Sequence, residues 1–263
     1  MEKELTDELQ ARALCVRRNI VSMPGAVHDG YLFSAVSSVD ILVWLYGGVL
    51  RVDPLSPSDE GRDRFVLSRI SAAPALYATL AEYGFFPRDE LWEYRRLGSM
   101  LQSTPEFRRT PGVDVTCGLP GIGLGTALGL ALTLRDAVPE ARVVCLLGAD
   151  ELTIGATHEA LTFAVEAALP NLLLIVEAEG GAKADIPLRA AGCRVVAADG
   201  HDMGSLDAAW RELTGADAPA RLRVLSARTV RARGLPRLKE DLLDGEDPLD
   251  CQATEDLISE MKA

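Results

Sequence analysis

The sequence predicts an α/β protein in which a mostly parallel β-sheet lies between two layers of helices. Short apolar segments rich in valine, leucine and isoleucine recur at VVCLLG (143–148) and NLLLIV (171–176). Segments with helical periodicity separate them, and this alternation is typical of parallel strands buried on both faces. With 263 residues the chain can bury a sizeable core, and we expect residues 1–263 to form one domain.

The amino-terminal half is expected to be mainly helical, with one short strand. Charged and apolar residues alternate there at helical spacing, and Pro105, Pro111 and Pro120 interrupt regular structure further on. The expected elements are a helix over 4–20, an apolar helix over Val39–Leu50, a polar loop over 56–64, a strand over Phe65–Ser68, helices over 72–83 and 89–96, and irregular structure over 98–120.

From residue 121 onward, helices and strands are expected to alternate. The charged segment RARGLPRLKEDLLDGEDPLD (231–250) predicts an exposed loop before a final helix. The expected elements are helix 121–137, strand 142–147, helix 153–168, strand 171–177, strand 193–198, helix 203–214, strand 221–230, loop 231–250 and helix 251–262.

Composition and charge exclude several classes of function. The formal net charge of −12 argues against a nucleic-acid-binding surface. No apolar run reaches the roughly 18–20 residues needed to span a bilayer, so we expect no membrane segment. The acidic start MEKELTDELQ is not typical of a secretory signal. Five widely spaced cysteines without a CxxC pair favour a reduced, cytoplasmic protein.

A glycine-rich segment, GLPGIGLGTALGLAL, is the first candidate for binding chemistry. Gly118, Gly121 and Gly123 let backbone N–H groups approach an anion, but they equally let a helix pack closely against a sheet. The dinucleotide pattern GxGxxG is broken at Thr126 or Leu128, depending on its first glycine, and the absence of GK[ST] excludes a P-loop. Phosphate binding and close packing therefore stay open as alternatives.

The sequence GADEL (148–152) follows an expected strand and is the second candidate. Ligands of parallel sheets bind beyond the carboxyl ends of the strands, where Gly148, Asp150 and Glu151 are expected to lie. Carboxylate oxygens there suit Mg²⁺ or Ca²⁺ beside a phosphate. Alternatively, Asp150 or Thr153 caps the following helix and Glu151 interacts with the helix dipole.

The third candidate, EAEGG (177–181), ends the next strand. Glu177 and Glu179 are two residues apart and point to the same side of an extended chain. With Asp150 they are candidate metal ligands, while Gly180 is a candidate cofactor-binding position. The alternative is that the carboxylates are splayed into solvent, because three of them repel one another without a cation.

Histidine is scarce, which limits acid–base and metal chemistry. His158 lacks the second histidine of HExxH, and we expect it on a helix face. For His201, in the turn DGHD, we expect a capping or packing role. His28, in an expected loop, is the histidine left for chemistry.

Taken together, the segments resemble the N-terminal, pyrophosphate-binding domain of the transketolase family. The resemblance covers most of the chain and implies the thiamine diphosphate-binding variant of the α/β/α fold. The matching segments are Val39–Pro54, Arg62–Leu91, Arg108–Leu132, Leu146–Leu161, Leu169–Gly180, Asp199–Asp202 and Ala227–Gly234.

The resemblance is to the smaller subunit of a split, two-chain transketolase. It implies a thiamine diphosphate site shared with a second chain, the transketolase C-terminal half with its pyrimidine-binding domain, in a hetero-oligomer or dimer. It also implies Mg²⁺, with Asp150 and Glu179 as the candidate ligands. The candidate cofactor-binding residues are Gly118, Gly121, Gly123, Gly148, Asp150, Glu151 and Gly180.

The cofactor and metal motif is degenerate relative to the family. The metal-binding aspartate of the family's GDG motif matches Ala149, and an asparagine that also binds the metal matches Glu179. The first change removes a charge from the metal site, and the second adds negative charge beside a diphosphate. Family histidines that line the diphosphate and sugar channel match Tyr31, Ser71 and Thr104. A glutamine of the family's glycine loop matches Ile122, and a glutamate at the start of the following helix matches Ile154.

Three functions follow as hypotheses. The first is a subunit of a thiamine diphosphate-dependent enzyme that transfers a two-carbon ketol unit with an altered metal and diphosphate site. The second is a degenerate, non-catalytic subunit that scaffolds or regulates a pyrimidine-domain partner. The third is an unrelated nucleotide-binding α/β protein. No residue of this chain is identified as catalytic. Candidates for an exposed apolar interface are Trp44, Trp92 and Phe107, each of which is also compatible with the interior.

Overall fold

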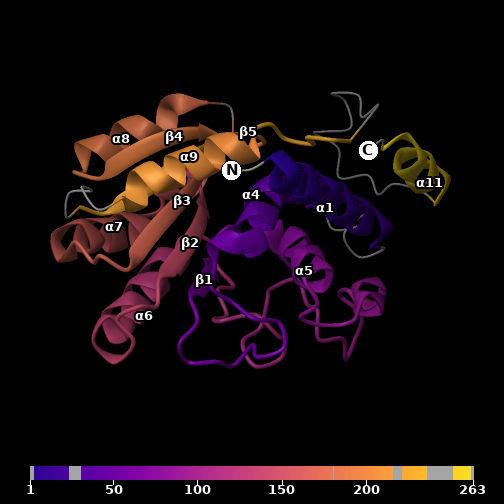
Figure 1. The fold of residues 1–263 in the computed structure, drawn as a ribbon, viewed down its shortest axis with the longest axis horizontal. Helices are drawn as coiled ribbons and strands as arrows, with labels where there is room; N and C mark the ends of the chain where they lie inside the picture. The colour runs from indigo at the N-terminus through magenta and orange to yellow at the C-terminus, as the bar shows by residue number, and fades with distance from the viewer. Residues whose placement is uncertain (1–2, 24–30, 180, 216–220, 236–250, 262–263) are drawn as a thin grey trace.

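The computed structural model describes residues 3–23, 31–179, 181–215, 221–235 and 251–261. Across these residues, five parallel strands form one sheet in the order β1-β2-β3-β5-β4 (Figure 1). Helices cover both faces, so the predicted three-layer α/β/α fold is confirmed. The strands are β1 (Arg64–Leu67), β2 (Val143–Gly148), β3 (Leu172–Glu179), β4 (Arg194–Asp199) and β5 (Arg223–Thr229).

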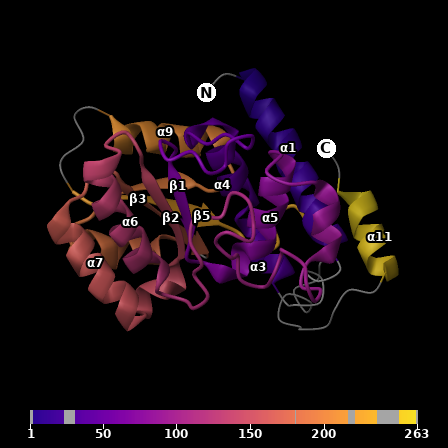
Figure 2. The same ribbon diagram turned by 90° about the horizontal axis from the view of Figure 1, so that it is seen from below.

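Two apolar cores lie on the two faces of the sheet, because alternate strand residues point in opposite directions. Val144 and Leu146 of β2 belong to one core, and Cys145 and Leu147 belong to the other. Helices α4 and α5 lie on one side of the strands and α6 and α7 on the other (Figures 1 and 2). The first core takes in α1 (Lys3–Ser22), α3 (Leu32–Ser37), α4 (Val39–Trp44), α5 (Ala73–Glu82), α9 (Met203–Thr214) and α11 (Cys251–Glu260), and the second takes in α6 (Gly123–Ala137), α7 (Gly155–Ala167) and α8 (Asp185–Ala190).

A buried carboxylate fixes the amino-terminal edge of the sheet. Asp63 is fully buried directly before β1. It accepts the backbone N–H groups of Arg51 and Arg142, both at 2.9 Å, and both guanidinium groups also donate to it. These bonds hold the start of β1 beside the start of β2, where Arg64 lies opposite Val143. Removing one partner of a buried ion pair typically costs about 3–5 kcal/mol.

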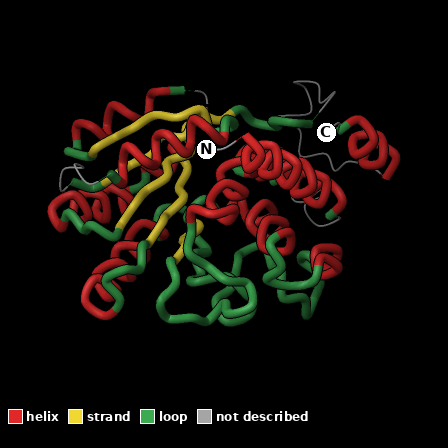
Figure 3. The backbone as a smooth tube through the Cα atoms, viewed as in Figure 1, coloured by secondary structure: helices red, strands yellow, loops and turns green. Residues whose placement is uncertain are grey.

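Several predicted elements differ in length or type. The expected helix Val39–Leu50 is α-helical only to Trp44 and continues as a π-helical turn, Leu45–Val49, in which Gly48 has a φ of 145°. The expected helix 89–96 is a 3-10 helix, Arg88–Glu93. The short helices α3 and α8 were not expected, since six residues carry too few turns for a periodic pattern. Residues 98–120 are irregular as predicted (Figure 3).

The candidate interface residues separate into interior and surface. Trp44 is buried and packs edge-on against Trp210, with ring centroids 5.5 Å apart. Trp92 and Phe107 are 40% and 50% exposed. Of the predicted loop 231–250, residues 236–250 lie outside the described residues, as does His28. No helix in the described part of the chain has the length and apolar character needed to cross a bilayer.

Two glycines of α6 test whether the glycine-rich segment serves packing. A Cβ built on Gly123 would lie 2.7 Å from the Cα of Ser68, whereas one on Gly129 meets nothing within 4 Å. We expect Gly123→Ala to destabilise the protein by about 1–3 kcal/mol because it overpacks the helix against β1. Gly129→Ala, in the exposed interior of the same helix, should stabilise it by up to about 1 kcal/mol. Urea denaturation measures both, and equal effects would contradict the packing role.

Candidate functional site

The carboxyl ends of β1, β2 and β3 meet at a cavity of about 440 Å³. The parallel order of the strands places residues 68–71, 148–151 and 177–179 at this edge, and the sequence predicted this position for the last two segments. The cavity is lined by polar side chains from these ends and from neighbouring segments, including Ser34, Arg69, Ser71, Asp150, Glu179 and Arg231.

Glu177 is the most constrained side chain at this edge. It is 1% exposed, and the hydrogen-bond and ion-pair partners that the structure gives it are all donors. Ser37 and Ser38, at the junction of α3 and α4, donate to its two oxygens at 2.6 and 2.5 Å. Thr229, at the end of β5, donates to it at 3.0 Å, and Arg69 forms an ion pair with it. The buried carboxylate therefore joins the sheet to the helical layer.

Arg69 connects the two glutamates that the sequence singled out. Its guanidinium forms ion pairs with Glu177 and with Glu179, the latter at 3.2 Å. Both carboxylates thus lie on one side of β3, as their spacing predicted. Glu177 is not splayed into solvent, while the side chain of Glu179 is 37% exposed. Burial lowers the pKa of Arg69, but the charges of Glu177, Glu179 and Asp150 outweigh it and raise the pKa overall.

Glu151 lies beside the glycine-rich segment and accepts a hydrogen bond from its backbone. Its carboxylate is 2% exposed and accepts the backbone N–H groups of Gly121 and Gly148 at 2.8 and 2.9 Å. The hydroxyl of Ser68 donates to it at 2.5 Å. Two N–H groups that were candidates for a phosphate are thus bound to a side chain of the same protein.

The remaining candidate residues are spread over the same edge. Gly123 is packed against Ser68, whereas Gly118 is exposed and its nearest side chain is Thr104. Asp150 is exposed and does not cap α7, whose first residue is preceded by Ile154 without a side-chain cap. Gly180 lies outside the described residues. As cofactor-binding positions, these residues stay predictions.

His201 is held in place by contacts of its ring to two segments, at Val230 and at Asp40. The backbone N–H of Val230 donates to its Nε2 at 2.9 Å, so the proton resides on Nδ1, which donates to Asp40 at 2.7 Å. Asp40 also pairs with Arg17 at 2.5 Å. Burial raises the pKa of Asp40, but the hydrogen bond from His201 and the charge of Arg17 lower it overall. This geometry agrees with the packing role expected for DGHD. His158 lies exposed on α7, as expected.

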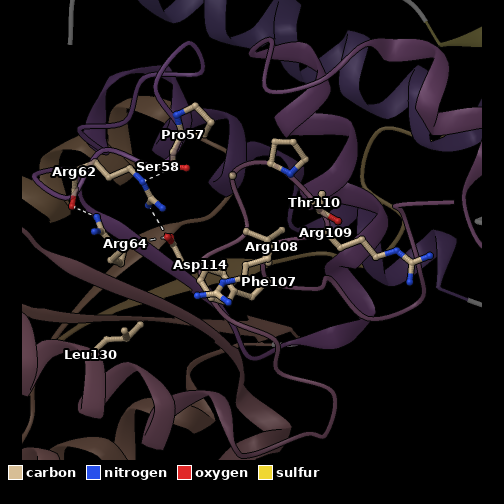
Figure 4. Close-up of a pocket in the computed structure, with 13 residues that line it drawn as sticks. Pro57, Ser58, Arg62, Arg64, Phe107, Arg108, Arg109, Thr110, Asp114 and Leu130 are labelled. Carbon is tan, nitrogen blue, oxygen red and sulfur yellow. Dashed lines mark hydrogen bonds and ion pairs between the residues drawn. The ribbon is translucent and has the colours of Figure 1, made fainter. Parts of the chain in front are cut away.

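A larger cavity of about 510 Å³ lies at the outer edge of β1, beside the loop 107–113 (Figure 4). Two of its arginines, Arg62 and Arg64, are engaged within the protein. Arg62 pairs with Asp114 at 2.5 Å and donates to the carbonyl of Pro57, and Arg64 donates to the carbonyls of Arg62 and Glu60. These contacts fix the loop against the edge strand, so the strand-end cavity is the better candidate for chemistry.

The residues at the strand ends do not fit a divalent cation. Among the described residues, no group of three or more histidine, cysteine, aspartate or glutamate side chains is arranged to hold a metal ion. Ala149 offers no side-chain oxygen, and Arg69 pairs with Oε1 of Glu177 and with Oε2 of Glu179. The hydroxyls of Ser34 and Ser71 and the guanidinium of Arg231 are instead donors suited to an anion.

A family model described as "Transketolase, thiamine diphosphate binding domain" matches residues 10–210. The chain belongs to the transketolase family. The 6-deoxy-6-sulfo-D-fructose transketolase subunit SqwG of Clostridium sp. (strain MSTE9) is 31% identical over 240 residues, 86% of each chain. An apulose-4-phosphate transketolase subunit of Actinobacillus succinogenes is 35% identical over 173 residues, 64% of this chain and 62% of that one.

Undivided transketolases are longer than this chain. The transketolase of Pongo abelii is 30% identical over 273 residues, which are 99% of this chain but 43% of the relative. The crystal structure of Campylobacter jejuni transketolase matches with a TM-score of 0.82 and 23% identity over 98% of this chain and 43% of that chain. This likeness confirms that the fold is the one found in transketolases.

Several residues of the site were absent from the sequence-based prediction of a transketolase-family site. Arg69, Ser37, Ser38 and Thr229 make the polar contacts that the structure describes for Glu177, and none was singled out as a site residue. The replaced family positions Ser71 and Ala149 do line the cavity, as their place in the motifs implied. The strand-end rule could have indicated Arg69, since it follows β1 by two residues, and it also lies in the family-like segment Arg62–Leu91.

The bonds of Glu151 predict a large effect of a small change. Glu151→Gln keeps the volume but removes the charge and turns an N–H₂ group toward donors that need an acceptor. We expect a loss of about 2–4 kcal/mol in the free energy of unfolding, since hydrogen bonds to a charged group contribute about 1.5–3 kcal/mol each. Urea denaturation measures it, with Glu159→Gln on the exposed face of α7 as the control. Equal stability of the two variants would contradict the assignment.

The ion pair of Glu177 predicts a pH dependence. Burial raises its pKa, but the charge of Arg69 and the hydroxyl hydrogen bonds outweigh this and hold it below the ordinary 4.5. The resulting stability is present above pH 4.5 and is lost as pH falls through the lowered pKa. Glu177→Gln should therefore cost about 3–5 kcal/mol at pH 7. The difference in free energy of unfolding between the variant and the wild type should shrink in acid. Urea denaturation at a series of pH values measures this difference, and a constant difference would refute the prediction.

Proposed function

We propose that the chain is the diphosphate-binding subunit of a two-chain, thiamine diphosphate-dependent transferase of the transketolase family. The observation that carries this proposal is the match to a transketolase subunit over 86% of both chains, while an undivided transketolase is covered to 43%. The partner would be a chain that carries the C-terminal half with the pyrimidine-binding domain. The assembly would then be a hetero-oligomer that transfers a two-carbon ketol unit from a ketose.

The strand-end cavity supports binding of the diphosphate by this chain. The hydroxyls of Ser34 and Ser71 and the exposed guanidinium of Arg231 are donors that face it. Gly118 lies exposed at the entrance to α6, where its backbone is accessible. When bound, thiamine diphosphate supplies the carbanion chemistry itself. This chain then orients the diphosphate end and excludes water from one side, while the partner supplies the groups for proton transfer.

A second function, a non-catalytic subunit that scaffolds or regulates its partner, is favoured by one specific observation. The carboxylates at the strand ends are balanced by Arg69, and two glycine N–H groups are bound to Glu151. A cavity with fewer free donors binds a diphosphate less tightly. Four described cysteines are free thiols, which fits the cytoplasmic location that we propose for either function.

Co-expression with the pyrimidine-domain chain of the same genome tests the proposal. We expect the two chains to co-purify and the complex, but not this chain alone, to bind thiamine diphosphate in calorimetric titration. Arg231→Ala should weaken this binding about tenfold or more, because a charge-assisted bond contributes about 1.5–3 kcal/mol. The matched control is Arg135→Ala at the far end of α6, where the guanidinium pairs with Asp136.

The outcomes separate the two functions. A stable complex that binds no thiamine diphosphate would favour the scaffolding subunit over the enzyme. Failure of the chains to associate would contradict both functions, since each requires the partner. Equal weakening by Arg231→Ala and Arg135→Ala would show that the effect is nonspecific and would remove the strand-end cavity as the binding site.

A further inference from the structure

We propose that Arg69 is a built-in cation that takes the place of a divalent metal ion at the carboxyl ends of β2 and β3. The guanidinium belongs to the chain itself and balances the carboxylates that a metal would otherwise have to hold. The site is therefore closed to Mg²⁺, and any anion that enters binds through hydroxyl and guanidinium donors. The inference concerns this chain's own residues and holds for either proposed function.

The position of Arg69 is set by the backbone around it. Both Ser68 and Arg69 donate their N–H groups to the carbonyl of Leu146, at 2.9 and 3.2 Å, so the end of β1 is fixed to β2. The side chain then passes over Gly148, where a Cβ would lie 3.7 Å from the Cδ of Arg69. That separation is an ordinary van der Waals contact, so the arginine packs beside Gly148 on its way to β3.

The guanidinium of Arg69 pairs with one oxygen of Glu177 and one oxygen of Glu179. One terminal nitrogen pairs with Glu177, and the other lies 3.2 Å from an oxygen of Glu179. The side chain of Arg69 is 10% exposed and that of Glu177 is fully buried, so water screens the pair poorly. A metal bound between Glu177 and Glu179 would compete with Arg69 for these oxygens, and it would lie beside a positive group that cannot lose its proton.

The charges in the cavity explain why a cation is required at this point. Asp150, Glu177 and Glu179 carry three negative charges, and Arg69 and Arg231 are the positive side chains that line the same cavity. Without Arg69, two carboxylates that meet at one guanidinium would face each other directly. Such a pair is a ligand set for a divalent ion when nothing else neutralises it.

The test compares Mn²⁺ binding by the full-length wild type and by Arg69→Gln, followed by electron paramagnetic resonance and by thermal unfolding. The wild type should leave Mn²⁺ free and unfold at the same temperature with EDTA or Mn²⁺. Arg69→Gln should lower Tm by on the order of 10 °C, because it leaves Glu177 buried without its cation. Mn²⁺ should restore several degrees of this loss and bind at least tenfold more tightly than to the wild type.

Three further variants make the result specific. Arg69→Lys keeps the positive charge and should remain unresponsive to Mn²⁺. Glu179→Gln in the Arg69→Gln background should abolish the gained response, because one carboxylate is lost. Arg142→Gln is the matched control: it weakens the pairing of the buried Asp63 at the other end of the sheet, where no second carboxylate is paired with the same arginine among the described residues. It should lower Tm without any response to Mn²⁺.

Either of two results would overturn the inference. One is Mn²⁺ binding by the wild type that Glu179→Gln removes, which would show a metal beside Arg69. This result is readable even where Arg69→Gln fails to fold. The other is a folded Arg69→Gln protein that ignores Mn²⁺, which would leave Arg69 as an ordinary packing residue.

A second arm uses the complex with the pyrimidine-domain chain and rests on the proposed function. Thiamine diphosphate should bind with the same Kd, within about twofold, in EDTA and in Mg²⁺. Tightening by tenfold or more in Mg²⁺ would overturn the inference and leave the proposed enzyme intact. No binding in either buffer would count against the enzyme, while the Mn²⁺ titration would still decide the role of Arg69.

Discussion

The buried carboxylate of Glu177 is the constraint on which this end of the molecule depends. A carboxylate with no exposed surface needs a cation and hydrogen-bond donors, or it costs several kcal/mol in stability. Its donors come from the α3–α4 junction, from the end of β1 and from the end of β5. Satisfying this one group therefore fixes how the short helix α3 meets the sheet. The cavity walls follow from that junction, since Ser34 lies on α3 and Arg69 follows β1.

A second buried carboxylate, Glu151, fixes the position of the glycine-rich segment, as Glu177 fixes the position of α3 and α4. It draws the backbone of Gly121 and Gly148 toward itself and fixes the approach of α6 to β1 and β2. Both acids are bound inward, so neither is available as a ligand. The polar character of the cavity is consequently that of its hydroxyls and of Arg231, which fits an anion better than a cation.

The sequence predicts the sheet well because the strands are continuous apolar runs, and it predicts which strand ends meet because parallel strands end at one edge. It placed Glu177 and Glu179 on the same side for the simple reason that side chains alternate along a strand. It could not reveal Arg69, Ser37 or Ser38 as their partners, since these residues lie more than a hundred positions away from Glu177. Trp44 and α3 show the same limit, because burial and short helices are decided by packing rather than by local pattern.

If Ala149 and Glu179 replace metal ligands of the family, as the resemblance implies, the two replacements are better explained as one coordinated change than as decay of a site. Random loss of a metal-binding aspartate at Ala149 would leave the acids of β3 repelling one another, with Glu177 buried and unpaired. Instead, Glu177 has a full set of partners, and the arginine that neutralises it also reaches Glu179. Two acids at 177 and 179 are tolerated because Arg69 pairs with both of them. The guanidinium of Arg69 is part of the chain and cannot dissociate, so the charge balance at this edge does not depend on a diffusible ion. The side of the cavity that stays open to a ligand carries the donors Ser34, Ser71 and Arg231.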